Sequence, residues 1–515
     1  MQQKIQQAAA QIPDRFDRRF PRWPRTGVKI GAIAAVLQAR RVCLAGRPQQ
    51  RRAATGLRTA PRHSINRPIA HSARSSGLAR SSFAGRGGGP VAVGGVLAFA
   101  LGHGATSHLW GHIMSTVEKP PAAKQIIPSA TELVARARAL APKLKERAVR
   151  AERDRDIPPE SVAEYIGAGL IHTLQPKRWG GYEHDHEVAF DIAIELGRST
   201  CGSSAWCLNY LADHACILAH FPEEAQHDVW SRDKAACIAT SAAPTGKAAV
   251  APGGYRLNGR WSWCSGLGHS QWIMIGGLVF RDGEDHPDMR LYLVPVSELK
   301  QEDTWYCAGL RGTGSNTSVL DDVFVPEHRS VSFSTLRDAQ SPGSKINTNP
   351  IYRAPFIAVH SYALLGPALG LARGGYADFV QWTKARYLTY TQLNIAQHVP
   401  VQLRVAEIAA QIDAAELLAR RALATARADY TGMSMATRTL LRRDFTYALR
   451  MLRDAMDGLV KISGSSGLLE SNSVQRCWRD VHTISSHVVM NWDVPAENFG
   501  RMEFGLGLNP AYPMF

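Results

Sequence analysis

The sequence predicts an α+β protein in which two helical regions flank a separate β layer. Residues 129–230 carry apolar side chains at helical spacing, and residues 236–331 carry short alternating or apolar runs bounded by turn residues. Residues 355–491 return to helical spacing in long blocks. Helices, then strands, then helices along the chain are typical of a fold whose sheet forms its own layer. The expected structured regions are 114–235, 236–345 and 346–515.

The first region is expected to be an N-terminal helical domain. It opens with an amphipathic run, TELVARARALAPKLKERAVRAERD, and continues after a Pro-Pro pair with SVAEYIGAGLI. A longer and more apolar stretch, HEVAFDIAIELGRSTCGSSAWCLNYLADHACILAHF, has the composition of a buried helix pair.

The middle region is expected to be a β-sheet or β-barrel domain. Its strand candidates are GGYRLNGRWSWCSG, QWIMIGGLVF, RLYLVPV and SVLDDVFVP, each bounded by Gly, Asp, Asn or Pro. No GxGxxG sequence follows a strand and opens a helix, so a Rossmann nucleotide site is not indicated.

The last region is expected to be a C-terminal four-helix bundle. Its blocks are PFIAVHSYALLGPALGLARGGYADFVQWTKAR, QLRVAEIAAQIDAAELLARRALATARADY and RTLLRRDFTYALRMLRDAMDGLVKISG. Several helices of this length with apolar stripes pack as an antiparallel bundle.

The net charge of +16 belongs to the N-terminal extension and not to the body of the protein. Residues 1–113 contain 18 Lys and Arg but only two acids, Asp14 and Asp17, whereas the remainder contains 42 of each sign. The extension is rich in Arg, Ala, Gly and Ser, so disorder is expected. It is interpreted as translated upstream sequence with the start at Met114, as a targeting peptide, or as a nucleic-acid-binding tail.

The cysteine spacing disfavours a zinc-binding protein, and the most apolar run of the extension is a poor membrane span. The eight cysteines show no CxxC or Cys/His cluster with metal spacing, which favours a reduced cytoplasmic protein without structural zinc. The uncharged run 87–104 is nearly as long as a membrane span, but it is rich in Gly and only weakly apolar. No membrane partner is therefore expected.

Four stretches of the body resemble the acyl-CoA dehydrogenase superfamily, in the same order along the chain. GGYRLNGRWSWCSG resembles the strand that ends in a Trp and, two positions on, a hydroxyl residue beside the flavin; these are Trp263 and Ser265. GLRGTGSNTSVLDDVFVP resembles the G-x-R-G-S-x-T loop with its following strand. ARYLTYTQLNIAQHVPVQLRVAEIAAQI and KISGSSGLLESNSVQRCWRD resemble bundle segments containing R-x-x-F-G and Q-x-x-G-G-x-G-Y…R-D. The resemblance implies the fold of that superfamily over residues 129–493.

The residue that carries dehydrogenase chemistry in that superfamily is missing. A dehydrogenase removes an α-proton from an acyl thioester with a Glu, which the family places nine residues after the Arg of R-D. Val488 stands at that position, and the alternative position is empty too, because residues 356–373 contain no Asp or Glu. Acyl-CoA dehydrogenation is therefore not expected.

One branch of the superfamily replaces the acid by histidine: the two-component flavin-dependent monooxygenases. The resemblance implies an oxygenase component that receives reduced FMN or FAD from a separate reductase. It would react this flavin with O2 to a flavin hydroperoxide and hydroxylate a small phenol- or indole-like substrate. The alternatives are a heteroatom (S or N) monooxygenase, and an acyl-CoA dehydrogenase-like or non-catalytic flavin-binding paralogue. A nucleic-acid partner is disfavoured by the neutral body, and a cytoplasmic homodimer or homotetramer is expected.

Two histidines compete for the place of the missing acid. His482 and His487 are five residues apart, so on one continuous helix they would point about 140° from each other. His487 adjoins the vacated Val488 position and is the predicted catalytic residue. His482 is expected to be a satisfied structural imidazole or a subunit contact. Unwinding near Ser485 would leave the choice open.

The other candidate residues follow from the resemblance and from their surroundings. Ser265 is expected to be catalytic, as a donor near the flavin N5. The predicted substrate-binding residues are His214, Thr240 and Arg353. The predicted flavin contacts are Trp263, Ser265, Ser241, Arg386, Gln397 and Gly464, the Arg386 segment meeting the flavin of a neighbouring subunit. Thr389 and Tyr390 replace the Phe-Gly of R-x-x-F-G, which leaves FMN and FAD both open.

Overall fold

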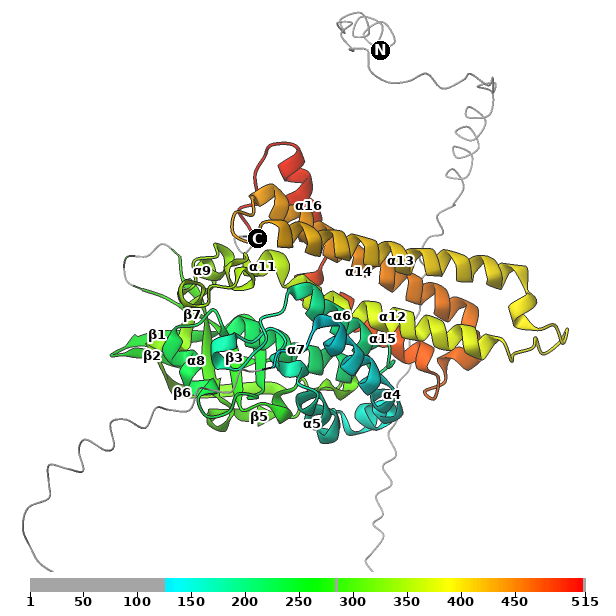
Figure 1. Ribbon diagram of the computed structural model, residues 1–515, viewed down its shortest axis with the longest axis horizontal. Coiled ribbons are helices and arrows are strands. Elements are labelled where there is room, and N and C mark those ends of the chain that lie inside the picture. The colour runs from blue at the N-terminus through cyan, green and yellow to red at the C-terminus, as the bar shows by residue number, and fades with distance from the viewer. Residues whose placement is uncertain (1–125, 282, 284–285, 513–515) are drawn as a thin grey trace, which may run out of the picture. The chain divides into compact units, whose positions relative to one another are not determined.

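A computed structural model of the chain describes residues 126–512 except 282, 284 and 285. The predictions for residues 1–113, for the run 87–104 and for the first residues of the body lie outside the described residues. Within the described chain, Figure 1 shows a sheet, a group of helices against it and a set of long, roughly parallel helix rods.

The helices that precede the sheet include one that is buried almost all round. Their bounds are α4 (Ala130–Asp154), α5 (Pro159–Gly167), α6 (His186–Gly197), α7 (Gly202–Leu218) and α8 (Glu223–Trp230), with the turns η1 (Leu170–His172) and η2 (Lys177–Trp179). α4 begins where the Ser129 side chain accepts a hydrogen bond from the Glu132 N–H at 3.1 Å. Every residue of α7 except Tyr210 is buried, which is the pattern of a helix at the centre of a domain.

The strands form one seven-stranded sheet. Their bounds are β1 (Ile238–Ala251), β2 (Gly254–Trp261), β3 (Trp272–Val279), β4 (Asp288–Pro295), β5 (Lys300–Glu302), β6 (Thr317–Pro326) and β7 (Ser330–Ser332). The order is β5-β6-β2-β1-β3-β4-β7, and among the strand pairs of residues 126–512 that the structure describes only β1–β3 is parallel. The β1 register shifts between Ser241 and Gly246, so the strand leaves its ladder directly after Ser241.

The last region contains the predicted long helices. They are α12 (Ser361–Thr383), α13 (Val399–Ala428), α14 (Met435–Ser463) and α15 (Ser473–Ser485), followed by α16 (Asp493–Glu503); Figure 1 shows α12, α13 and α14 running alongside one another. α12 packs closely on α6, because a Cβ added to Gly370 would lie 2.3 Å from the Ile194 carbonyl oxygen. The segment Phe356–Thr383 is long and apolar enough to pass a length-and-composition test for a membrane span, but most of it is buried inside the protein.

Short helices and turns connect these parts. They are η3 (Leu267–His269), η4 (Val296–Glu298), η5 (Arg311–Thr313), η6 (Glu327–Arg329), α9 (Phe333–Arg337), α10 (Pro342–Ile346), η7 (Pro350–Arg353), α11 (Phe356–Val359), η8 (Ile395–Gln397), η9 (Ser465–Leu468) and η10 (Val488–Met490). Two breaks differ from an uninterrupted helical reading of the sequence. The first bundle block is interrupted at His360, between α11 and α12, and α15 ends at Ser485, before His487.

Candidate active site

Three ring side chains of α7 form a ladder that faces the site. Trp206, Tyr210 and His214 are spaced four residues apart and therefore share one face of the helix. Their ring centroids lie 4.7 Å (Trp206–Tyr210) and 4.9 Å (Tyr210–His214) apart. Tyr210, the middle ring of the ladder, is the one residue of α7 that is not fully buried.

Trp263 and Ser265 lie on the connection after β2, and Ser265 meets this ladder. The Trp206 indole N–H donates to Ser265 Oγ at 3.2 Å, and Ser265 Oγ lies 2.7 Å from Ser315 Oγ. Trp263 is 67% exposed and has a left-handed backbone with φ of 63°. A large aromatic side chain in a strained and solvent-exposed position has the character of a binding platform rather than of core packing.

His487, which lies between α15 and η10, packs near the same indole. Its ring centroid lies 6.1 Å from that of Trp206. The Val489 N–H donates to His487 Nδ1 at 3.2 Å, so the neutral imidazole carries its proton on Nε2. Burial, followed by the charges of His360 and Arg442, lowers the pKa of His487 to about 4. The imidazole is therefore neutral at pH 7, rather than half-protonated as an ordinary histidine would be near its pKa.

His482 points elsewhere. Its Nε2 lies 2.9 Å from Asp457 Oδ1, and its ring packs on Trp478 at 5.0 Å between centroids. Both partners belong to the α14–α15 contact, which gives His482 a structural setting. Because α15 ends at Ser485, the helical angle between the two histidines no longer limits where His487 points.

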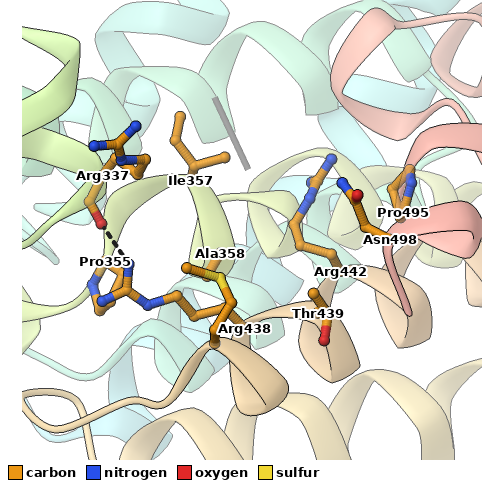
Figure 2. Close-up of a pocket in the computed structure, with 10 residues that line it drawn as sticks. Arg337, Pro355, Ile357, Ala358, Arg438, Thr439, Arg442, Pro495 and Asn498 are labelled. Carbon is orange, nitrogen blue, oxygen red and sulfur yellow. Dashed lines mark hydrogen bonds between the residues drawn. The ribbon is translucent and has the colours of Figure 1, made fainter. Parts of the chain in front are cut away.

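Arg442 of α14 holds the segment that follows His487. Its guanidinium donates to the Val489 carbonyl at 2.5 Å and to Ser361 Oγ, and burial lowers its pKa to about 10. Arg442 also lines a small cavity of about 20 Å³ beside α9, α11, α14 and α16. Figure 2 shows this cavity, with Arg438 donating to the Arg337 carbonyl at 2.9 Å across one side of it. The cavity has room for about one water molecule, so it is not the substrate site.

Three predicted residues lie where β1 approaches α7. His214 Nδ1 donates to the Ile238 carbonyl at 2.5 Å, and burial lowers the pKa of His214 to about 4. Ser241 Oγ donates to the Ser262 carbonyl at 2.8 Å. Thr240 Oγ1 is buried and has no hydrogen-bond partner among the described residues, which is costly unless a ligand supplies one.

Sequence reasoning missed a buried carboxylate–imidazole pair beside this wall. Asp213 Oδ2 lies 3.1 Å from His360 Nδ1, and Asp213 Oδ1 accepts from the Tyr362 hydroxyl at 2.9 Å. Burial acts to raise the pKa of Asp213, but His360 and the neighbouring donors outweigh it and lower that pKa. Asp213 directly precedes His214 and His360 stands at the break between α11 and α12. An acid next to a predicted site histidine on an otherwise apolar helix was the available signal.

The remaining predicted residues are not brought to this site. Arg353 is exposed on η7 and forms no hydrogen bond or ion pair with any residue between 126 and 512 that the structure describes. Arg386 stacks on Trp382 at 3.7 Å from the ring centroid and lies beside Gly464, while Gln397 is exposed. This group follows the C-terminal end of α12, whose 23 residues span ~35 Å from the His360 end.

The residues that do converge fit a flavin. A tricyclic ring with one apolar and one hydrogen-bonding edge matches the aromatic surfaces of Trp263, Trp206 and Tyr210 beside the hydroxyls of Ser265 and Thr240. The unpartnered Thr240 hydroxyl and the exposed Trp263 ring are the two features of this wall that packing alone leaves unexplained.

Comparison with known proteins gives consistent matches. The family described as "Acyl-CoA dehydrogenase, C-terminal domain" matches residues 362–492. The flavin-dependent monooxygenase oxygenase subunit HsaA of Rhodococcus jostii (strain RHA1) is 36% identical over 376 residues, which cover 72% of this chain and 97% of that protein. The oxygenase component of the FADH(2)-dependent resorcinol hydroxylase of Rhizobium sp. (strain MTP-10005) is 34% identical over 386 residues, covering 73% and 94%.

Solved structures agree with these relatives. The crystal structure of 3-HSA hydroxylase from Rhodococcus sp. RHA1 superimposes with a TM-score of 0.70 at 34% identity, covering 75% of this chain and 99% of that one. XiaF from Streptomyces sp., solved in complex with FADH2 and glycerol, superimposes with a TM-score of 0.69 at 29% identity, covering 75% and 97%.

Proposed function

Since the chain belongs to the oxygenase components of flavin-dependent monooxygenases, within the acyl-CoA dehydrogenase superfamily, we propose that it hydroxylates a small phenol-like aromatic compound at the Trp206 wall. It is an oxidoreductase that uses reduced flavin and O2, and a separate reductase supplies the reduced flavin. The observation that carries the site assignment is that Ser265 and His487 both contact Trp206. We place this chemistry in the cytoplasm.

Reduced flavin, when bound, supplies the electrons with which dioxygen is activated. In the proposed site the flavin would be held by the Trp263 ring, by Ser265 toward its N5 edge, and by Ser241 and Thr240 toward its pyrimidine edge. Trp206 and Tyr210 close the pocket, which excludes water from the reacting oxygen. Thr240 gains the hydrogen-bond partner that it lacks in the protein alone.

His487 is proposed as the proton donor. Its ring is neutral with Nδ1 occupied by the Val489 N–H, and its Nε2–H donates to no residue in the part of the chain that the structure describes. Arg442 fixes Val489 through its carbonyl, so it orients His487 without touching the substrate. A neutral donor in a low-polarity site gives up its proton only to a strong base, such as an oxygen that is gaining negative charge.

A hydroxyl-bearing aromatic is favoured over a thioether or an amine. His214 and the Asp213–His360 pair place two imidazoles and a carboxylate on the side of α7 next to the ladder. Such groups polarise or deprotonate a phenol and so activate its ring, whereas oxidation of sulfur has no proton to remove. Heteroatom oxidation remains the second candidate on this fold.

The flavin tail is proposed to meet Arg386, Gln397 and Gly464 of another copy of this chain. Arg386 Nη1 is buried with no hydrogen-bond partner among the described residues, and burial lowers its pKa. An anionic phosphate would satisfy that group. Arg386 follows the far end of α12, ~35 Å from His360, which is too far to contact the flavin held by the same chain. A homodimer or homotetramer follows, and Arg353 has no part in this proposal.

The test combines flavin specificity with a substrate screen. The purified protein with NADH alone should oxidise no NADH, and adding a flavin reductase should start hydroxylation of a phenol panel, with indoles and a thioether such as dibenzothiophene assayed in parallel. NADH oxidation by this chain alone would contradict the two-component assignment. Oxygenation of the thioether without any phenol product would favour the second candidate.

A further inference from the structure

Three hydroxyl groups form a chain behind Ser265. Ser265 Oγ lies 2.7 Å from Ser315 Oγ, which lies 2.6 Å from Thr313 Oγ1, which lies 2.9 Å from the Leu310 carbonyl oxygen. Two oxygen atoms at these separations repel each other unless a proton lies between them. The three oxygen–oxygen contacts therefore need three protons, and the three hydroxyls possess three.

The direction of the chain follows from its end. A carbonyl oxygen only accepts, so Thr313 donates to Leu310; Ser315 must then donate to Thr313, and Ser265 to Ser315. On its other side, Ser265 accepts the Trp206 indole N–H at 3.2 Å. Ser265 has therefore committed its proton and retains one lone pair. It can offer a ligand an acceptor but no donor, which differs from the donor role near the flavin N5 that the sequence predicted.

The end of the chain is fixed to the rest of the protein. The Leu310 N–H donates to Asp480 Oδ1 at 2.6 Å, and the Gly312 N–H donates to Ser203 Oγ at 2.9 Å. Thr313 and Ser315 are buried, with 0% and 3% exposure. The two inner links, Ser315–Thr313 and Thr313–Leu310, are therefore shielded from water, and reversing the proton order would leave the Leu310–Thr313 contact without a proton.

We propose that the Ser265–Ser315–Thr313 chain makes the site selective for reduced over oxidised flavin. The inference rests on the proposed function, in which Ser265 meets the flavin N5 edge. Reduced flavin carries a hydrogen on N5 and can donate to the Ser265 lone pair, whereas oxidised flavin presents a lone pair of its own there. The mismatch expels oxidised flavin, which a protein must release before it can accept the next reduced molecule from a reductase. Ser315 and Thr313 are specificity-determining residues that touch no ligand.

The proposal is tested by the dissociation constants of oxidised FAD in air and of dithionite-reduced FAD under anaerobic conditions, with FMN as a second probe. Thr313→Val removes two oxygen–oxygen contacts but only one proton, so Ser265 is free to donate outward. Ser315→Ala frees the Ser265 proton directly. Both variants should bind oxidised FAD about tenfold more tightly, as expected when one hydrogen bond replaces one lone-pair clash. The preference of the wild-type protein for reduced FAD should shrink by the same factor.

Two controls separate the proposal from general loosening. Thr313→Ser keeps the hydroxyl and should keep the wild-type preference. Ser318→Ala removes a buried hydroxyl of β6 that donates to the Cys264 sulfur at 3.2 Å, outside the Ser265–Ser315–Thr313 chain, and should also keep the preference. An unchanged preference in both Thr313→Val and Ser315→Ala, or an equal change in Ser318→Ala, would overturn the inference. Failure of the wild-type protein to bind reduced FAD would instead overturn the proposed function.

Discussion

His487 is predicted to stay neutral in the folded protein at every pH above about 5. Burial and the charges of His360 and Arg442 lower its pKa to about 4 from the ordinary value of 6.5. Between these two values the unfolded chain binds a proton that the folded protein does not, so stability is lost as the pH falls from 6.5 toward 4. At pH 5 this single group should cost about 2 kcal/mol of unfolding free energy relative to pH 8.

The perturbation is His487→Asn, which removes the titrating ring and its Nε2–H donor. In wild-type protein the product formed per reduced flavin should stay constant from pH 5 to pH 8, because His487 is neutral throughout. In His487→Asn it should fall about 10- to 100-fold at every pH, with hydrogen peroxide released instead. Urea unfolding at pH 8 and pH 5 should show that the variant loses about 2 kcal/mol less than the wild-type protein on acidification.

The control is His482→Gln, since His482 pairs with Asp457 away from Trp206. It should leave the product yield unchanged. A wild-type inflection in product yield between pH 6 and pH 7 that disappears in His487→Asn would refute the reasoning, because it would mean that the imidazole titrates at its ordinary pKa in the working enzyme.

Three further predictions follow from other contacts. Asp213→Asn leaves His360 without its carboxylate and should lower kcat for a phenol about tenfold or more with little change in KM, measured by steady-state oxygen uptake. Burial raises the pKa of Asp480 to about 6, so ionising this carboxyl lowers the free energy of unfolding as the pH rises from about 4 to 6. Asp480→Asn should remove this pH dependence and raise the free energy of unfolding by up to about 3 kcal/mol at pH 8, measured by urea unfolding. Arg386→Ala should weaken binding of reduced FAD about tenfold or more in anaerobic titration, whereas Arg404→Ala, an exposed arginine paired with Glu407 on α13, should not.

The fold class could be predicted from the sequence because the spacing of apolar residues can be read without knowing the tertiary structure. The α+β arrangement, the β layer and the long bundle helices are confirmed, since apolar spacing of 3.6 or 2 residues reports directly on which face is buried. Helix ends were less accessible. The end of α15 at Ser485 matches the unwinding that the sequence left open as an alternative. The break at His360 was not expected, and it has a tertiary partner, Asp213, that leaves no local signal in the sequence.

The site was only partly accessible for the same reason. Ser265 and His487 were predicted because a motif and a missing acid marked their positions, and the structure places both against Trp206. The sequence did not single out Trp206, because it lies on a helix with the pattern of ordinary core. Arg353 was singled out as a charge before an apolar helix, yet it lies exposed on the surface. A charge at a helix start has a common explanation in solvation, and sequence alone does not separate that from binding.

Arg479 and Asp480 have a structural role in this protein, although the Glu of the dehydrogenases is absent. Arg479 donates to the Ala308 carbonyl at 2.5 Å and to Glu152 at 2.8 Å, while Asp480 accepts the Leu310 N–H. The pair therefore clamps the loop from both sides just before Thr313. If Thr313 sets the proton order behind Ser265, this clamp belongs to the flavin site and not to the lost acyl-thioester chemistry. A protein can thus lose the catalytic acid at the Val488 position and still need Arg479 and Asp480, which stand nine and eight residues earlier.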